Sequence, residues 1–210
     1  MGFTGFGKGA PAFFEELAAN NARDWWLSNK ARYDAEVREP LELLLEDLAA
    51  EFGEAKVFRP NRDTRFAKDK SPYKTNAAAV IPRGDGASTY VSLSAEGLHI
   101  GGGGYHLERD QLARFRTAID AERSGAELEQ IAADLREHGA DVTAHSILKT
   151  APRGYSADHP RITLLRMGGI IGIWAYPPRA WLYTAKVRDK VAEQWRALDP
   201  LNAWLATNVG

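Results

Sequence analysis

Apolar side chains recur at spacings of three and four residues through the first quarter of the chain. This spacing places them on one face of an α-helix, so it predicts an amphipathic helix over residues 28–52, ended by Gly53. A shorter helix is predicted from Pro11 to Asn20. Because Pro40 lies inside the longer pattern and removes one backbone hydrogen bond, we expect it to kink or divide that helix.

Short apolar runs, typical of β-strands, follow this helical region at residues 77–81, 89–93 and 98–100. Turn-forming sequences separate them at residues 83–86 and 96–97. Gaps this short can join antiparallel strands, whereas parallel neighbours need crossovers of about a dozen residues or more. The runs therefore predict β-hairpins that form a meander.

The second half of the chain predicts mainly helices. Helical patterns occupy residues 112–119 and 126–137, a short helix between 158 and 169, and residues 179–206 with an interruption at Asp199-Pro200. Residues 170–176 are typical of a strand. Helices, then a hairpin sheet, then helices predict an α+β fold in which an antiparallel sheet packs with N-terminal, central and C-terminal helices. Residues 1–210 are expected to form a single domain, because this length can bury one continuous core.

Composition narrows the class of protein. Hydrophobic residues make up 44% and charged residues 26%, which is typical of a globular protein and argues against a disordered or fibrous one. No run approaches the roughly 18 apolar residues that cross a bilayer, and the first residues lack the apolar core of a signal peptide. The absence of cysteine excludes disulfides and thiolate chemistry. We therefore expect a soluble, cytoplasmic protein that does not span a membrane.

The charge distribution points to one segment. The formal net charge of the chain is −1, so attraction to nucleic acid or anionic lipid has to come from a local patch. Between residues 59 and 74 six basic residues face two acidic ones, a local net charge of +4. These residues are Arg59, Arg62, Arg65, Lys68, Lys70 and Lys74, with Asp63 and Asp69.

The segment from residue 59 to residue 75 mixes charges of both signs with aromatic and turn-forming residues. If its first arm is extended, alternation places Asp63 and Arg65 on one face, and Arg62 and Phe66 on the other, with Phe66 entering the core. Pairing with a nearby carboxylate would then orient the arginines. A segment built only for solubility would not need this mixture.

Arginine suits bidentate recognition of carboxylate or phosphate, and lysine supplies a compact charge with three donors. The leading hypothesis is therefore a site for a small anionic, phosphate-bearing ligand. Its predicted ligand-binding residues are Arg62, Arg65, Lys70, Tyr73 and Lys74, which we expect to gather around one hollow.

Two residues of the segment are also candidates for catalysis. Asp63 would orient the arginines or act as a base, and the extended Ser71-Pro72 pair is expected to present the phenol of Tyr73 to a ligand. The pattern assembles no nucleophile, so the sequence leaves open whether the protein is an enzyme. Secondary candidates for the same site are Arg59, Asp69, His99, Gly103 and Tyr105.

The run from Arg62 to Phe66, followed by the run from Asp69 to Thr75, resembles the signature of a microbial family designated domain of unknown function 2461. Other pieces across nearly the whole chain also resemble this family. They are Asn21, Arg23, Trp26, Tyr33, Pro40, the glycines before Tyr105, Pro152-Arg153-Gly154-Tyr155 and His159-Pro160. The resemblance implies a shared fold and a shared site, and it brings no activity with it.

Two functions of other classes stay open. The first is a nucleic-acid-binding module in which Lys68, Lys70, Lys74 and Arg83 contact phosphates. The second is a structural or protein-interaction domain in which the alternating charges form an ion-pair ladder, where each exposed pair adds only about 0–1 kcal/mol of stability.

The remaining chemistry-bearing residues give weaker indications. Residues 101–104, all glycine, are expected between a strand and a helix, where backbone N–H groups can hold an anion; a close approach of backbones is the alternative. The histidines show no metal-binding spacing, so no metal site is predicted, and the sequence leaves open whether a cofactor is used. His99 could serve the anion site as acid or base, or be structural. The tryptophans are expected mainly to fill the core, and His159 to belong to a helix-start turn.

Overall fold

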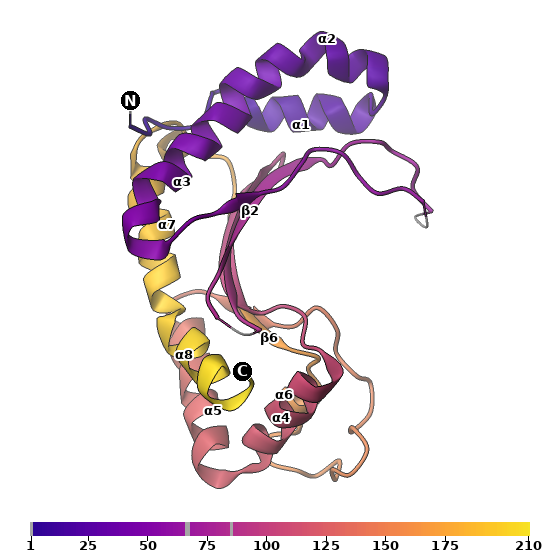
Figure 1. Cartoon of the computed structure of the whole chain (residues 1–210), viewed down its shortest axis with the longest axis vertical. Coiled ribbons are helices and arrows are strands. Elements are labelled where there is room, and N and C mark those ends of the chain that lie inside the picture. The colour runs from indigo at the N-terminus through magenta and orange to yellow at the C-terminus, as the bar shows by residue number, and fades with distance from the viewer. Residues whose placement is uncertain (1, 66–67, 85) are drawn as a thin grey trace. The chain divides into compact units, whose positions relative to one another are not determined.

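The structure is a computed structural model that describes residues 2–65, 68–84 and 86–210 (Figure 1). The predicted entry of Phe66 into the core lies outside these residues. Helices are α1 (Ala10–Ala19), α2 (Arg23–Tyr33), α3 (Glu39–Phe52), α4 (Arg109–Asp120), α5 (Glu122–Glu137), α6 (Ile162–Leu165), α7 (Lys186–Ala197) and α8 (Asp199–Asn208), with a π-helical turn η1 (Asp34–Arg38) and a 3-10 turn η2 (Ala180–Tyr183).

One six-stranded sheet accompanies these helices, in the order β1-β2-β3-β4-β6-β5. Its strands are β1 (Lys56–Val57), β2 (Asn76–Pro82), β3 (Ser88–Ser94), β4 (Gly97–Gly104), β5 (Asp141–Thr143) and β6 (Ile170–Tyr176). Both edge pairs are antiparallel: Lys56 lies opposite Val80, and Val142 lies opposite Gly172. The predicted α+β fold with an antiparallel sheet is confirmed, whereas the very short strands β1 and β5 were not predicted.

The predicted long helix begins earlier than expected and contains an irregular turn. Figure 1 shows α2 and α3 as successive parts of one long helix, joined through the π-helical turn η1. Pro40 lies in the first turn of α3. A proline there removes a backbone N–H that a helix start does not use, so the sequence accommodates it through η1 instead of ending the helix.

The glycines at residues 101–104 form the second half of β4, so the expectation that they link a strand to a helix was wrong. Helix α4 begins only at Arg109. A Cβ atom on Gly102 would lie 2.4 Å from the carbonyl oxygen of Ser88, and one on Gly103 would lie 2.4 Å from that of Ile170. Neighbouring strands thus approach too closely for any side chain, which is the alternative that the sequence had left open.

The chain forms two compact units, and the boundaries between them fall within β2, β3, β4, β6 and α7. Unit 1 comprises Met1–Ile81, Tyr90–His99 and Ala175–Glu193; unit 2 comprises Pro82–Thr89, Ile100–Trp174 and Gln194–Gly210. The single domain expected over residues 1–210 stays a prediction.

Unit 1 has an aromatic core between α1 and α2. The ring of Phe13 lies 5.5 Å from that of Phe14 and 5.6 Å from that of Tyr33, between centroids. Trp26 lies 4.9 Å from Tyr33 and 6.1 Å from Phe13. This cluster fixes the first turns of α2, which carry residues of the candidate site.

Unit 2 has a core in which α8 contacts α4 and α5. The ring of Trp204 meets that of Phe115 edge-on, with centroids 5.9 Å apart, and its indole N–H donates to the carbonyl of Ser124 at 2.9 Å. The predicted break between the last two helices is confirmed, because α8 begins at Asp199 with Pro200 in its first turn. The buried tryptophans are Trp26, Trp174, Trp195 and Trp204, in agreement with the predicted core role.

The helices of the described ranges are all too short or too polar to cross a bilayer.

Candidate functional site

Residues 59–65 and 68–75 form two arms that extend from unit 1, which we name the basic ribbon (Figure 1). An antiparallel bridge joins Asn61 to Tyr73. The N–H of Arg62 donates to the carbonyl of Pro72, and the N–H of Lys74 donates to that of Pro60, both at 2.8 Å. These bonds hold the two arms side by side at the base of the ribbon.

Tyr73 anchors the ribbon to α2. The side chain of Asn21 holds the Tyr73 backbone at two points: its amide donates to the carbonyl at 2.9 Å, and its oxygen accepts the N–H at 3.1 Å. The Tyr73 ring stacks on Trp26 with centroids 4.3 Å apart and planes 12° apart. The expectation that Ser71-Pro72 presents this phenol to a ligand is corrected, because stacking leaves Tyr73 only 7% exposed. Its catalytic role stays a prediction that this burial does not favour.

Both arginines of the predicted site pair with carboxylates of the ribbon itself. Arg65 binds Asp63 through two donors, at 2.9 Å from Nε and 2.6 Å from Nη2. Arg62 pairs with Asp69. The predicted orientation of arginines by neighbouring carboxylates is therefore present, but Arg65 remains 77% exposed.

These contacts also stabilise the charged form of the two carboxylates. Hydrogen bonds from Arg65 lower the pKa of Asp63 below its ordinary value. Hydrogen bonds from Ser71, and then one from Arg62, lower the pKa of Asp69 to about 2. Both aspartates are thus anionic at neutral pH, and Asp63 is a correspondingly weak base.

The lysines of the ribbon bind carbonyl groups instead of carboxylates. The ammonium of Lys70 donates to the carbonyl of Thr64, and that of Lys74 donates to the carbonyl of Arg59, both at 2.9 Å. Lys74 also lies over the ring of Phe58, 5.3 Å from its centroid. Burial, and then the charge of Arg59, lower the pKa of Lys74. Arg59 and Lys74 are therefore neighbouring cations.

The five predicted ligand-binding side chains do not share one environment. Arg62 and Arg65 each face their own aspartate, and Tyr73 faces Trp26. The ammonium groups of Lys70 and Lys74 bind carbonyl oxygens, and neither is paired with a carboxylate of the described residues. The expected gathering around a single hollow is thus not the observed arrangement, and the binding roles of the residues stay predictions.

The secondary candidates lie at different places. Arg59 and Asp69 belong to the ribbon, whereas His99 lies in β4 near Glu96, whose pKa it helps to lower after the hydrogen bonds that Glu96 accepts. Gly103 and Tyr105 belong to unit 2. Tyr105 is exposed there, and its ring lies 4.7 Å from that of His145.

A cleft of about 650 Å³ adjoins the base of the ribbon within unit 1. Trp26 and Tyr33 provide its aromatic wall. The other lining residues are Lys30, Asp34, Arg38, Glu39, Glu42, Pro60 and Asn61. We name this feature the aromatic cleft.

The aromatic cleft depends on the π-helical turn η1. Arg38, at the end of η1, donates to Glu42 at 2.5 Å and to the carbonyl of Phe58 at 3.4 Å, so it links the long helix to the residue just before the ribbon. Burial raises the pKa of Tyr33, and the charge of Arg38 partly offsets this. Single π-helical turns are frequent at functional sites.

Carboxylates outnumber cations along the aromatic cleft. Lys30 pairs with Asp34, and Arg38 pairs with Glu42, which leaves the charge of Glu39 in excess among the lining residues. The lining of the aromatic cleft therefore carries a net negative charge. The only sequence signals for this cleft are Trp26, Tyr33 and Pro40, which are among the residues that resemble the family.

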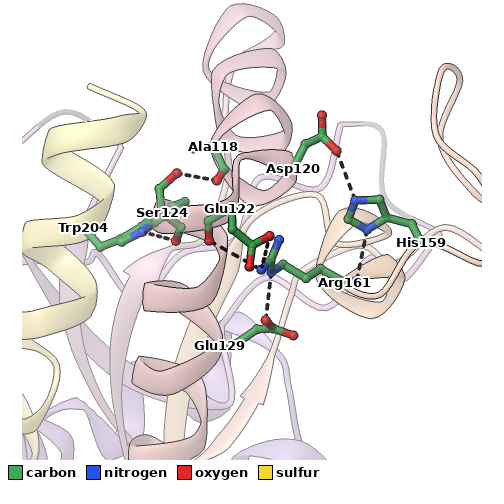
Figure 2. A network of polar contacts seen from close by, with 8 residues as sticks. All are labelled: Ala118, Asp120, Glu122, Ser124, Glu129, His159, Arg161 and Trp204. Atoms are coloured by element: carbon green, nitrogen blue, oxygen red, sulfur yellow. Dashed lines mark hydrogen bonds and ion pairs between the residues drawn. The ribbon is translucent and has the colours of Figure 1, made fainter.

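One family-like residue, His159, belongs to a network of polar contacts in unit 2, which Figure 2 shows. Arg161 is only 7% exposed, and it donates to Glu129 at 2.8 Å and to the backbone carbonyl of Glu122 at 3.4 Å. The backbone N–H of Arg161 donates to Nδ1 of His159 at 3.0 Å. Nε2 of His159 lies 3.1 Å from a carboxylate oxygen of Asp120.

We name these five residues the Arg161 network. It ties the segment before α6 to α4 and α5, which is a structural role. The carbonyl of His159 accepts the N–H of Ile162 at 3.0 Å, which confirms that His159 lies in a helix-start turn. Within residues 2–65, 68–84 and 86–210, no three His, Asp or Glu side chains are arranged to hold a metal ion.

The chain matches a family model over residues 10–204, and that family is described as "Conserved hypothetical protein (DUF2461)". This confirms the resemblance drawn from the sequence. A comparison with curated proteins found no match.

Proposed function

This chain belongs to the DUF2461 family of conserved hypothetical proteins, and we propose that its basic ribbon binds a small anionic ligand that bears phosphate. The observation that carries the proposal is the pair of neighbouring cations Arg59 and Lys74. Lys74 donates to the backbone of Arg59 at 2.9 Å, and the charge of Arg59 contributes to its lowered pKa. The charge of Arg59 thus disfavours the charged form of Lys74, and an anion bound beside both side chains offsets this repulsion.

The two cations are chemically complementary. Within the part of the chain that the structure describes, the guanidinium of Arg59 makes neither a hydrogen bond nor an ion pair, although its charge helps to lower the pKa of Asp63. Its planar donors can therefore bind phosphate oxygens. Lys74 adds a compact charge whose partial burial strengthens its attraction to an anion. Together they form the centre of the proposed site.

Arg62 and Arg65 supply further charge at the edge of the site. Their pairs with Asp69 and Asp63 are exposed, and exposed pairs contribute only about 0–1 kcal/mol each. A phosphate group can therefore replace an aspartate as the partner of an arginine at small cost. The aspartates keep the guanidinium groups oriented until such a group binds.

The anchor at Tyr73 prepares the site for binding. Asn21 and Trp26 fix the backbone and ring of Tyr73, so Lys74 is held in place on the next residue. Order that exists before binding lowers the entropic cost of binding. The aromatic cleft, which shares residues 60 and 61 with the ribbon, would receive the neutral or cationic part of the same ligand.

Thermal denaturation and calorimetric titration of the full chain test this proposal. The probes are inorganic phosphate, pyrophosphate and a mononucleotide, each in buffer of low ionic strength. We expect at least one to raise the Tm and to release measurable heat, since binding to the native state stabilises it by mass action. The variant Arg59→Gln/Lys74→Gln should lose this response.

The matched control is Lys186→Gln/Arg188→Gln, which removes two positive charges from α7 without touching the ribbon. It should keep the response of the unchanged chain. An equal loss of response in both double variants would reduce the effect to net charge and contradict the proposal. So would the absence of any response to all three probes.

One observation favours a nucleic acid as a second candidate. The cations of the ribbon follow an exposed, two-armed extension, and two-stranded ribbons of this kind serve as nucleic-acid contacts in other proteins. Lys68 and Lys70 are exposed there, whereas Arg83 belongs to unit 2 and pairs with Asp199 at 3.0 Å. Retention of a short oligonucleotide that falls steeply with salt, without a response to mononucleotide, would favour this candidate.

A further inference from the structure

Asn61, at the base of the ribbon, has an unpaired backbone edge. In its antiparallel bridge, the hydrogen bonds to the second arm come from the flanking residues Pro60 and Arg62, at 2.8 Å each. The N–H and C=O of Asn61 itself therefore point away from the second arm. Among the described residues, these two groups have no hydrogen-bond partner, and Asn61 is exposed. A donor and an acceptor thus stand side by side on an accessible edge.

This free edge belongs to the aromatic cleft. Pro60 and Asn61 line the cleft from the ribbon, and Glu39 lines it from the first turn of α3. Glu39 is exposed, and its carboxylate makes neither a hydrogen bond nor an ion pair among the described residues. An ionised carboxylate only accepts hydrogen bonds. The cleft therefore offers one free N–H donor, one free C=O acceptor and one free carboxylate to a ligand.

The proposed anion site lies close to this edge. Arg59 is two positions before Asn61, so their Cα atoms are at most about 7 Å apart. Lys74 is held beside Arg59, to whose carbonyl it donates at 2.9 Å. One small molecule can therefore reach both the cations and the cleft. Because the cleft lining carries a net negative charge, the phosphate stays outside and an uncharged part of the molecule enters.

The free groups of the cleft define the chemistry of that uncharged part. Its edge has to offer an acceptor to the N–H of Asn61, and one donor each to the C=O of Asn61 and to Glu39. An exocyclic amino group beside a ring nitrogen offers this set, and adenine and cytosine both carry it. Hypoxanthine and uracil have a carbonyl oxygen in place of the amino group, which a carboxylate repels. The cleft volume of about 650 Å³ is typical of small-molecule sites.

We propose that the phosphate-bearing ligand is a nucleotide of adenine or cytosine, with its phosphate on Arg59 and Lys74 and its base in the aromatic cleft. The amino group of the base donates to the C=O of Asn61 and to Glu39, and the neighbouring ring nitrogen accepts from the N–H of Asn61. This inference rests on the proposed function, because the ribbon has to hold the phosphate. It adds a preference among nucleotides.

Calorimetric titration of the full chain with five probes tests this preference. Adenosine and cytidine monophosphate carry the amino group, inosine and uridine monophosphate carry the carbonyl oxygen, and ribose 5-phosphate has no base. We expect at least one amino-bearing nucleotide to bind about tenfold tighter than its carbonyl counterpart, and also tighter than ribose 5-phosphate.

Two matched variants locate the preference. Glu39→Gln supplies an amide that donates as well as accepts, so it should bring the affinities for the amino and carbonyl nucleotides close together. Glu46→Gln removes an equal charge from an exposed position of α3 outside the cleft, and it should keep the difference.

Failure of this inference can be told apart from failure of the proposed function. If all five probes bind equally, the ribbon holds phosphate without a base in the cleft, and the inference alone is overturned. If none binds, both proposals are overturned. A preference that survives in Glu39→Gln, or that is lost equally in Glu46→Gln, also overturns the inference. If Glu39→Gln fails to fold, the comparison of probes on the unchanged chain decides.

Discussion

Arginine–carboxylate pairs occur in both units, but under opposite conditions. In the basic ribbon, Arg62 and Arg65 are 32% and 77% exposed, and each meets one aspartate from the same segment. In the Arg161 network the arginine is 7% exposed, and its two partners, Glu122 and Glu129, both belong to α5. The same chemical pair therefore holds the fold together in unit 2 and remains exchangeable in unit 1.

The two kinds of pair differ because water can replace a lost partner at an exposed arginine but not at a buried one. A buried guanidinium that loses its carboxylate has no substitute partner, so the network resists change. An exposed pair exchanges with water or with another anion at little cost. On the proposed function, this exchange is what lets a ligand bind to the ribbon, whereas the Arg161 network offers no such exchange.

The largest expected effect is on Arg161. Arg161→Ala should lower the Tm by several degrees, because Glu129 and the carbonyl of Glu122 lose a buried donor. Calorimetry measures the shift. Arg188→Ala, which removes an exposed pair on α7, is the control and should change the Tm little. Equal shifts in both variants would remove the contrast between buried and exposed pairs.

Removal of the ribbon's anchor comes next. Tyr73→Ala should cost about 3 kcal/mol of unfolding free energy, because it deletes a buried ring stacked on Trp26. It should also weaken phosphate binding, since Lys74 is then held less firmly. Urea denaturation and calorimetric titration measure the two effects. A stable variant with unchanged phosphate affinity would show that the anchor does not prepare the site.

Replacement of Arg65 should change ligand affinity more than stability. Arg65→Ala removes only an exposed pair with Asp63, which is worth at most about 1 kcal/mol, so the Tm should move by at most about 2–4 °C. Binding of pyrophosphate should nevertheless weaken several-fold. If instead the Tm falls clearly and the affinity stays the same, the ribbon is a structural ion-pair ladder, as the third hypothesis from the sequence states.

The smallest effect concerns the pH dependence of Asp69. Its pKa in the folded chain is about 2, below the ordinary 3.8, because Ser71 and Arg62 bind the charged form. This stabilising contribution is therefore complete above the ordinary pKa and is lost as the pH falls through about 2. NMR titration of the carboxyl carbon should give a midpoint near that value. A midpoint near 3.8 would mean that these contacts do not persist in solution.

Periodic spacing accounts for most of what the sequence predicted correctly. It located most of the helices, the four central strands and the break at Asp199-Pro200, because burial of one face imposes the spacing directly. It missed β1 and β5, which are too short to show a period, and it misjudged residues 101–104, because a strand of glycines has no side chains to alternate.

The candidate site was predicted only in part, because the sequence pattern reveals contacts between neighbouring positions and not those between distant ones. The charges of the ribbon and their local pairing follow from neighbours in the sequence. The burial of Tyr73 does not, because its partners Asn21 and Trp26 are about fifty positions away. The aromatic cleft depends on the π-helical turn η1, and the pattern around Pro40 predicted only a kink or a break.

The central claim is that Arg59 and Lys74 form an anion site, and the titration of Lys74 tests it most directly. NMR detection of its side-chain methylene next to the ammonium reports the pKa with and without pyrophosphate. The account predicts a pKa below the ordinary 10.5 in the free protein, and a rise when pyrophosphate binds and offsets the charge of Arg59. A pKa of Lys74 that stays unchanged at saturating pyrophosphate would contradict it.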